Sequence, residues 1–114
     1  MSSRRGQFAV IFVSTQTDNQ QGYGEAATLM EEIAASMPGY CGIESVRGED
    51  GLGITVSYWE SEAAIAAFRA ETRHRAAQAN GRSQWYERYA IHTAQIVRSH
   101  SWQKEMSEEE KNNG

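Results

Sequence analysis

The fold of this chain is decided by residues 47–68, which read RGEDGLGITVSYWESEAAIAAF. The run GEDG at 48–51 indicates a tight turn between two antiparallel strands, because glycine readily adopts the positive φ that such turns need. Apolar and polar residues then alternate, with Ile54, Val56 and Tyr58 on one face, which predicts a strand with a strongly apolar side. We therefore expect a β-hairpin centred on this turn.

A helix is expected directly after the hairpin. Ser61 is a suitable N-cap, and Glu62 places a negative charge in the first turn, where the helix dipole favours it. The alanine-rich run at 63–68 has a high helix propensity. Its apolar spacing can be continued to a stop at Gly81, but the arginines around His74 leave open whether the helix breaks there.

Four further segments have clear periodicities. Residues 7–15, QFAVIFVST, are apolar on both faces of a strand, and such a strand must be covered on both sides. Residues 23–37 carry apolar side chains at the spacing of an amphipathic helix, which the Pro-Gly pair after it ends. Residues 40–46 form the first strand of the hairpin, and the alternating run YAIHTAQIVRSHSW at 89–102 predicts a long last strand.

The order of these elements is β-α-β-β-α-β, the ferredoxin-like plan of an α+β fold. In this plan both helices lie on one face of a four-stranded antiparallel sheet, and the other face is bare. Whichever face of the first strand meets the helices, three apolar side chains remain on the opposite face. Burying each of them is worth about 1.5–3 kcal/mol, so we predict a homodimer whose sheets face each other.

Composition limits the class of protein. A chain of 114 residues is one domain, which we place at 7–102, between a disordered N-terminus at 1–6 and a disordered acidic tail at 103–114. The single Cys41 excludes an intramolecular disulfide and suits a reducing compartment. No apolar run reaches the length of a membrane span, and the N-terminus lacks the hydrophobic segment of a secretion signal. We expect a cytoplasmic soluble protein.

Charge is distributed unevenly along the chain. The net charge of −4 argues against a general nucleic-acid binder, which usually carries a basic surface. Residues 69–98 nevertheless contain six arginines against Glu71 and Glu87. A basic segment on an acidic protein suits a small anionic ligand better than a polymer. The simpler interpretation is that these arginines lie on solvated faces.

The chain resembles the antibiotic biosynthesis monooxygenase (ABM) family of the dimeric α+β barrel superfamily, from about Phe8 to Arg98. The matching patterns are GYGE at 22–25, PGY at 38–40, ES at 44–45, RGEDG at 47–51 and GITVSYW at 53–59, then His74 and Trp85-Tyr86. Members of this superfamily include cofactor-independent oxygenases of polyphenolic polyketides, haem-degrading monooxygenases and proteins with no established activity. The resemblance implies a dimer that oxidises an aromatic, polyketide-like phenol with O₂ and without a cofactor or metal.

The haem-degrading branch matches less well. That branch uses an Asn on the first strand, a Trp on the second helix, and an iron-ligating His ten residues after the Trp. Aligned on residues 61–64, this chain has Phe68 and Gln78 at the last two positions and no Asn within 7–15. Haem degradation is therefore a minor alternative, which would need a ligand shifted to His74.

Cofactor-independent oxygenation requires a base or hydrogen bonds that stabilise a phenolate, and a cavity that excludes water. The candidates are His74 and Tyr86 for catalysis, and Phe68, Glu71, Gln78, Arg82, Trp85 and His92 for substrate binding. Histidine is the natural base near neutral pH. The arginine and the aromatic residues are suited to an anionic aromatic ligand by charge and stacking.

Two of these assignments depend on structure that the sequence leaves open. If the second helix is continuous, Glu71, His74 and Gln78 share one face, and Glu71 is placed to orient His74. His92 is a second candidate if its face of the last strand lines a cavity between the sheet and the helices.

Each candidate also has a simpler explanation. His74 among arginines suits an exposed helix, Phe68 suits the core, and Trp85 with Tyr86 suits packing against a partner subunit. Glu71-x-x-His74 alone is too common to imply a metal. The competing functional class is a non-catalytic dimer that binds a small ligand or has a structural role.

Overall fold

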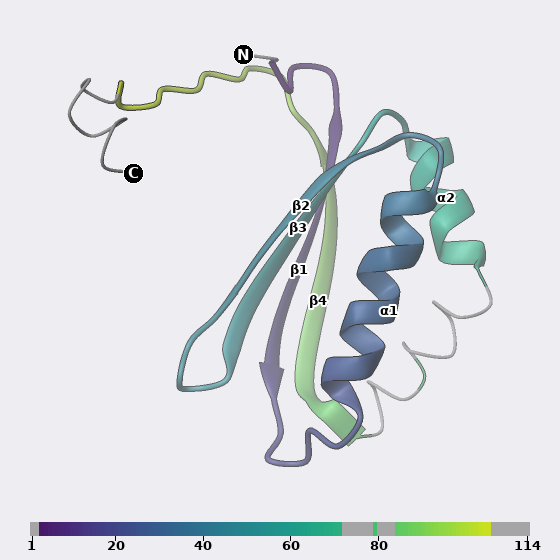
Figure 1. Ribbon diagram of the computed structural model, residues 1–114, viewed down its shortest axis with the longest axis vertical. Helices are drawn as coiled ribbons and strands as arrows, with labels where there is room; N and C mark the ends of the chain where they lie inside the picture. The colour runs from purple at the N-terminus through teal and green to yellow at the C-terminus, as the bar shows by residue number, and fades with distance from the viewer. Residues whose placement is uncertain (1–2, 72–78, 80–83, 106–114) are drawn as a thin grey trace, which may run out of the picture.

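The computed structural model describes residues 3–71, 79 and 84–105, which form an antiparallel sheet covered by two helices. The elements are β1 (Phe8–Gln16), α1 (Tyr23–Ser36), β2 (Tyr40–Arg47), β3 (Leu52–Trp59), α2 (Glu62–Ala70) and β4 (Tyr86–Gln95). The strands lie in the order β2-β3-β1-β4. Both helices cover the same face of the sheet (Figure 1). The predicted ferredoxin-like order is therefore confirmed.

The turn between β2 and β3 has the geometry that its glycines predict. Gly51 has a φ of 87°, and its amide donates to the carbonyl of Gly48 over 3.1 Å. The Leu52 amide donates to the Asp50 carboxylate, also over 3.1 Å. These bonds fix the register of the hairpin, in which Arg47 pairs with Gly53.

Helix α2 begins where the sequence predicts and ends before His74. The Ser61 side chain accepts the amide of Ala64 over 3.1 Å, as expected for an N-cap. The helix ends at Ala70, and Glu71 has an extended backbone with ψ 127°. The sequence left open whether this helix continues to Gly81, and the structure ends it at Ala70. No large apolar side chain follows Phe68 until Trp85, so a longer helix would have nothing to bury against the sheet.

The register of β1 settles which of its two apolar faces meets the helices. Phe8, Val10 and Phe12 lie on the helix side, and the first two pack against the core. Ile11 lies on the opposite face, where it pairs with Val56 on β3. We call this opposite side the bare face. Its other apolar members include Ala9, Val13, Val46 and Ile54.

The core occupies one end of the layer between the sheet and the helices. Its buried members are Ala34 on α1, Trp59 on β3 and Ile65 on α2. Trp59 has no exposed surface, and its indole N–H donates to the Ser57 hydroxyl over 2.9 Å. Phe68 stacks on Trp59 with the ring centroids 5.2 Å apart. Because the core fills only this end, the remainder of the layer is available for a pocket.

Gly39 allows helix α2 to approach the start of β2 closely. Its φ is +88°, and a Cβ there would lie 2.6 Å from the Cβ of Ala64. Gly39→Ala is expected to lower the free energy of unfolding, measured in urea, by about 2 kcal/mol or more. Gly24→Ala is the control, because Gly24 lies in α1 with nothing within 4 Å of the added methyl. That change should raise stability by about 0.5–1 kcal/mol, and equal effects at both sites would contradict the prediction.

The two ends of the domain differ from the sequence-based expectation. Residues 1–6 are predicted to be disordered, but the Arg4 guanidinium lies 3.8 Å from the centroid of the Tyr58 ring and donates to the Gln7 side chain over 2.9 Å. Strand β4 ends at Gln95 and does not continue to residue 102; beyond the start of β1 at Phe8, the Ile96 backbone still bonds to Gly6 and Gln7, each over 2.9 Å. Residues 97–105 then run away from the sheet (Figure 1). Most of the predicted tail, 106–114, lies outside the described residues.

Candidate functional site

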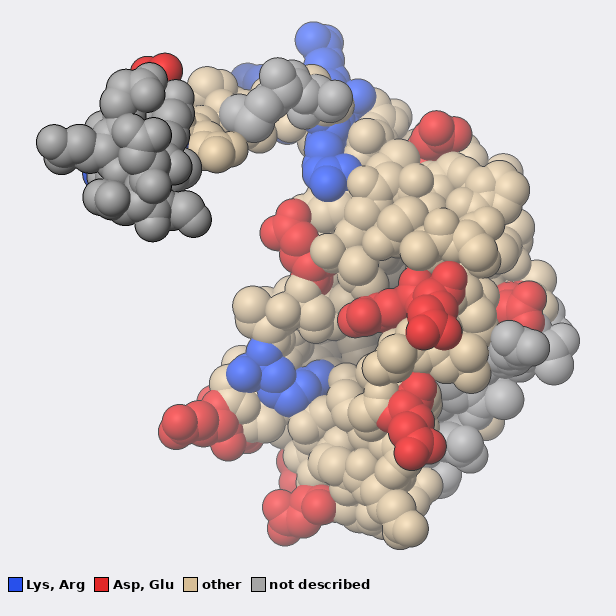
Figure 2. Space-filling view, viewed as in Figure 1, with Lys and Arg blue, Asp and Glu red and all other residues tan. Residues whose placement is uncertain are grey.

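A pocket of about 220 Å³ lies between the sheet and the helices, beside the core. Figure 2 shows the molecule hollowed between these two layers, with acidic side chains beside the hollow. Aromatic rings form both ends of the pocket, and small or apolar side chains of α1, such as Ala27 and Met30, form its floor. The described walls are therefore largely apolar, which suits a flat hydrophobic ligand.

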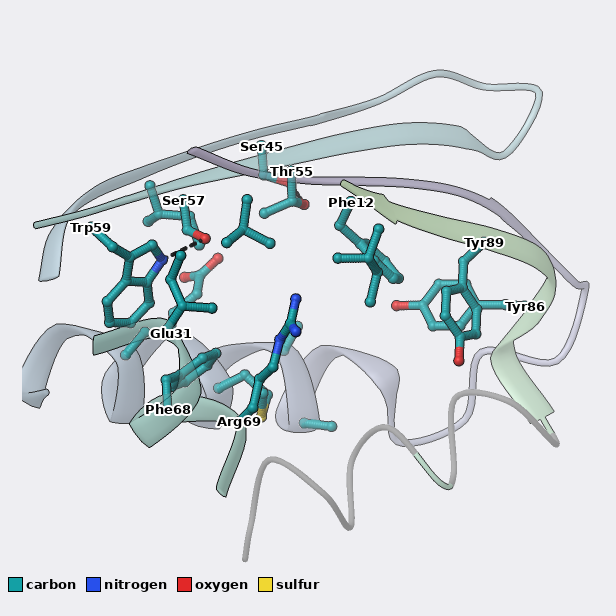
Figure 3. Close-up of a pocket in the computed structure, with 18 of the residues that line it drawn as sticks. Phe12, Glu31, Ser45, Thr55, Ser57, Trp59, Phe68, Arg69, Tyr86 and Tyr89 are labelled. Carbon is teal, nitrogen blue, oxygen red and sulfur yellow. Dashed lines mark hydrogen bonds between the residues drawn. The ribbon is translucent and has the colours of Figure 1, made fainter. Parts of the chain in front are cut away.

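Four aromatic rings cluster at one end of the pocket. The Phe12 ring centroid lies 5.4 Å from that of Tyr86 and 5.5 Å from that of Tyr89. Tyr23, from the start of α1, contacts Tyr86 edge to face with the centroids 6.2 Å apart. These distances are typical of stabilising aromatic pairs. Three phenol groups are thus gathered from α1 and β4, and we call Tyr23, Tyr86 and Tyr89 the tyrosine cluster. Figure 3 shows Tyr86 and Tyr89 side by side.

Trp85 packs against Tyr23 of the tyrosine cluster and is itself held by the backbone. The side chain is only 5% exposed, and its indole N–H donates to the carbonyl of Gln21 over 2.9 Å. The Trp85 carbonyl accepts the Thr17 amide over 2.8 Å, and its ring meets Tyr23 edge to face at 5.5 Å. The indole N–H and the carbonyl of Trp85 are therefore hydrogen-bonded within the protein, and only an apolar ring edge of Trp85 faces the pocket.

A β-bulge brings Tyr86 and Tyr89 to the same side of the sheet. Thr15 pairs with Arg88 and Gln16 pairs with Tyr86, so Glu87 is an extra residue on β4. Without this bulge the period of two would place residues 86 and 89 on opposite faces. The bulge therefore builds the tyrosine cluster, and the alternation of the sequence does not reveal it.

Tyr86 is a hydrogen-bond donor under neutral conditions. Burial raises the pKa of its phenol well above the usual value, and the charge and hydrogen bond of Tyr23 raise it further. The positive charge of Arg47 acts in the opposite direction but does not outweigh them. The phenol consequently stays protonated at neutral pH, so Tyr86 is suited to stabilise an oxyanion and unsuited to act as a base.

Arg47 is held in place by β1 and by the hairpin turn. Its guanidinium donates to the Ser14 hydroxyl over 2.8 Å and to the Gly51 carbonyl over 2.5 Å. It crosses Gly53, where a Cβ would lie 2.5 Å from the Arg47 Cζ. Arg47 thus fixes a positive charge near Tyr86 and satisfies the buried Ser14 side chain.

The hydroxyl groups at the other end of the pocket have partners within the protein. The Ser45 and Thr55 hydroxyls are hydrogen-bonded to each other over 2.7 Å, and the Ser57 hydroxyl accepts the indole N–H of Trp59. Two charged side chains, Glu31 of α1 and Arg69 of α2, also line the pocket (Figure 3). These two side chains are the charged groups of the pocket within the described part of the chain.

The structure unites some of the predicted site residues and separates others. Phe68, Trp85 and Tyr86 all line the pocket. His92 is exposed and pairs with Ile11 on the bare face. Its face of β4 therefore does not line the cavity between the sheet and the helices. Glu71 follows the end of α2 and does not line the pocket. The predicted residues at 74, 78 and 82 lie outside the described residues, and so does any contact between Glu71 and His74.

Sequence reasoning missed several residues that line the pocket. Tyr23 was assigned only to the apolar stripe of a helix, Tyr89 only to one face of a strand, and Arg69 only to the basic segment. The position of Tyr23 at the start of α1 is one signal that could have indicated a pocket residue. A side chain there lies at the end of the layer between the sheet and the helices. Arg69 is followed by charged residues, which conceal its position in the last turn of α2.

Comparison with known proteins identifies the class to which this fold and pocket belong. Residues 7–80 match the family described as antibiotic biosynthesis monooxygenase, and the chain belongs to this family. The curated protein YqjZ of Bacillus subtilis (strain 168), described as uncharacterized, is 51% identical over 96 residues, which cover 84% of each chain. The resemblance seen in the sequence is therefore confirmed.

Solved structures of low sequence identity share the fold. A variant of SnoaB, a cofactor-independent oxygenase from Streptomyces nogalater, superposes with a TM-score of 0.71 at 10% identity, covering 82% of this chain and 96% of that one. The protein Rv0793 from Mycobacterium tuberculosis gives a TM-score of 0.73 at 13% identity, covering 83% and 99%. At these identities the likeness concerns the fold alone.

No helix in the described part of the chain has both the length and the apolar character that crossing a membrane requires.

Proposed function

We propose that this protein is a cofactor-independent monooxygenase that oxidises an aromatic phenol with O₂. The observation that carries the proposal is the pocket, which combines apolar walls with the protonated phenol of Tyr86. Its volume of about 220 Å³ is below the range of about 300–1,000 Å³ usual for drug-sized ligands, which favours a substrate of a few fused rings. The description of SnoaB as a cofactor-independent oxygenase supports the same reaction class.

The electrons for such a reaction come from the substrate. When a hydroxyanthrone loses a proton, its electron-rich anion can itself reduce O₂. One oxygen atom then becomes the carbonyl oxygen of the oxidised ring, and the other leaves as water with the two hydrogens of the former CH₂ group. The protein must take up the first proton and stabilise the anion. In our proposal His74 is the base, and Tyr86 donates a hydrogen bond to the substrate oxyanion.

The bare face supports a homodimer in which two sheets pack together. Ile54 on this face is 41% exposed and Val46 is 72% exposed, although both are β-branched apolar residues. Such side chains are stabilised by burial, and exposed apolar side chains in the middle of a sheet, here flanked by Glu44 and His92, are a typical site of association. The free thiol Cys41 supports the cytoplasmic location that we also propose.

Oxygen consumption tests the proposed reaction. Metal-free protein should consume O₂ with at least one member of a panel of hydroxyanthrones and catechols. His74→Ala should lower the rate by about 100-fold, because general bases contribute about 10²–10⁴-fold. Tyr86→Phe should lower it by about 10-fold, since a hydrogen bond to a charged group is worth about 1.5–3 kcal/mol. Tyr40→Phe is the control, because Tyr40 packs on Trp59 outside the pocket.

The same assay separates the alternatives. Phenols that bind without any oxygen consumption would indicate the non-catalytic ligand-binding dimer. A Soret shift on titration with haem, followed by loss of the haem spectrum with a reductant, would indicate the haem-degrading branch. Oxygen consumption that is unchanged in His74→Ala would retain the reaction and remove this residue as its base.

A further inference from the structure

Arg69 is an exposed residue that places a positive charge on the solvent-open side of the largely apolar pocket. The residue lies in the last turn of α2, and its side chain extends from the helix into the space between Phe68 and the tyrosine cluster (Figure 3). In the part of the chain that the structure describes, the Arg69 guanidinium makes no hydrogen bond and no ion pair, and it is the only cation among the pocket's lining residues. Its donors are therefore available to a ligand.

The shape of the guanidinium and the apolar side chains beside it suit an anionic aromatic ligand. A guanidinium offers paired N–H donors in a planar fork, which matches the two oxygens of a carboxylate. Because Arg69 is exposed, the pair is partly screened by water, and the apolar contact of the ligand ring with Phe68 adds to the affinity. An aromatic ligand with an anionic substituent would thus use both the walls of the pocket and the guanidinium.

Glu31, which is also exposed, would favour one orientation of such a ligand. Its carboxylate lines the pocket from α1, and it forms no ion pair with Arg69. Because the two charges do not neutralise each other, the pocket has one site for an anion and another for a hydrogen-bond donor. A carboxylate near Glu31 would be repelled, whereas a phenolic hydroxyl there could donate to it.

We propose that the substrate is a hydroxylated aromatic acid whose carboxylate binds Arg69. This inference rests on the proposed function, because it names the chemical class of the phenol that the pocket takes. It makes Arg69 a residue that determines specificity, acting on the charge of the substrate without contacting the reacting oxygen.

Equilibrium binding of three naphthalene derivatives tests the inference without any oxidation step. Naphthalene carboxylate, its neutral carboxamide and naphthol are titrated into the protein at neutral pH, with tryptophan fluorescence or calorimetry as the readout. The carboxylate should bind about 10-fold or more tightly than the carboxamide, because a hydrogen bond to a charged group is worth about 1.5–3 kcal/mol. Added salt should weaken the carboxylate more than the carboxamide.

Substitution then assigns the preference to a residue. Arg69→Gln should weaken the carboxylate by about 10-fold and leave the carboxamide and naphthol within about twofold, whereas Arg69→Lys should retain most of the preference. Arg5→Gln is the matched control, since it removes the same charge from an exposed residue outside the pocket. Circular dichroism shows whether each variant is folded.

Each outcome bears on one inference. Equal affinities for carboxylate and carboxamide, equal losses for both in Arg69→Gln, or no binding of the carboxylate would overturn the role of Arg69. A strong preference for the carboxylate in a protein that never consumes O₂ would overturn the oxygenase proposal alone. Naphthol binding without a preference for the carboxylate would leave the phenol pocket and remove only its anion site.

Discussion

Trp59→Ala is expected to lower the free energy of unfolding by about 3–5 kcal/mol, the usual cost of removing a buried aromatic side chain. Trp59 has no exposed surface and lies between Tyr40, at 5.7 Å between ring centroids, and Phe68, at 5.2 Å. Its loss also removes the indole N–H that donates a hydrogen bond to the Ser57 hydroxyl.

Urea denaturation of two matched variants measures this effect. Trp102→Ala removes the same side chain from a position that is 78% exposed, and its effect should stay within about 0.5 kcal/mol. Trp59→Phe keeps a ring in the core and should fall between the two. A loss below about 1 kcal/mol in Trp59→Ala would show that the site collapses around the missing ring, contrary to the rigid packing inferred here.

Val56→Glu is expected to convert the proposed dimer into a monomer. Val56 lies on a central strand of the bare face, between Ile11 on β1 and Glu44 on β2. In a dimer that packs two such faces together, the substitution buries two unpaired carboxylates, and each costs several kilocalories per mole. In the single subunit the side chain is only half-buried, so the fold itself should persist.

Light scattering reports the mass directly. The unaltered protein should show twice the chain mass of 12.7 kDa, and Val56→Glu should show 12.7 kDa with a native circular dichroism spectrum. Leu29→Glu is the control, because Leu29 is 38% exposed on helix α1, away from the bare face. A monomeric mass for the unaltered protein, or loss of the dimer in both variants, would contradict sheet-to-sheet association.

Much of the fold could be predicted because its signals are local. The GEDG turn needs only the positive φ of Gly51, and the start of α2 needs only the hydroxyl of Ser61. The ferredoxin-like plan predicted a side of the sheet without helices, and the two apolar faces of β1 predicted that this side still carries apolar side chains. The end of α2 was harder to predict, because helix propensity continues past Ala70 whereas the apolar contacts with the sheet do not.

The site was only partly predictable. Phe68, Trp85 and Tyr86 were expected from their residue types and do line the pocket. His92 was expected from its residue type alone, and the pairing of β4 with β1 places it on the bare face. Residue type tells which chemistry a side chain can perform, but strand pairing decides which cavity it faces.

By itself the sequence determined the order of the elements, the hairpin, the family and the excess of apolar surface on the sheet. The order, the hairpin and the apolar excess follow from periodicity, turn chemistry or composition within short stretches of chain, and the family follows from the resemblance of its motifs. Only the tertiary structure decided that a bulge at Glu87 turns Tyr86 and Tyr89 to the same side, and that Arg69 reaches into the pocket beside them. These positions depend on how segments far apart in the chain pair and pack. A local sequence pattern does not predict that pairing.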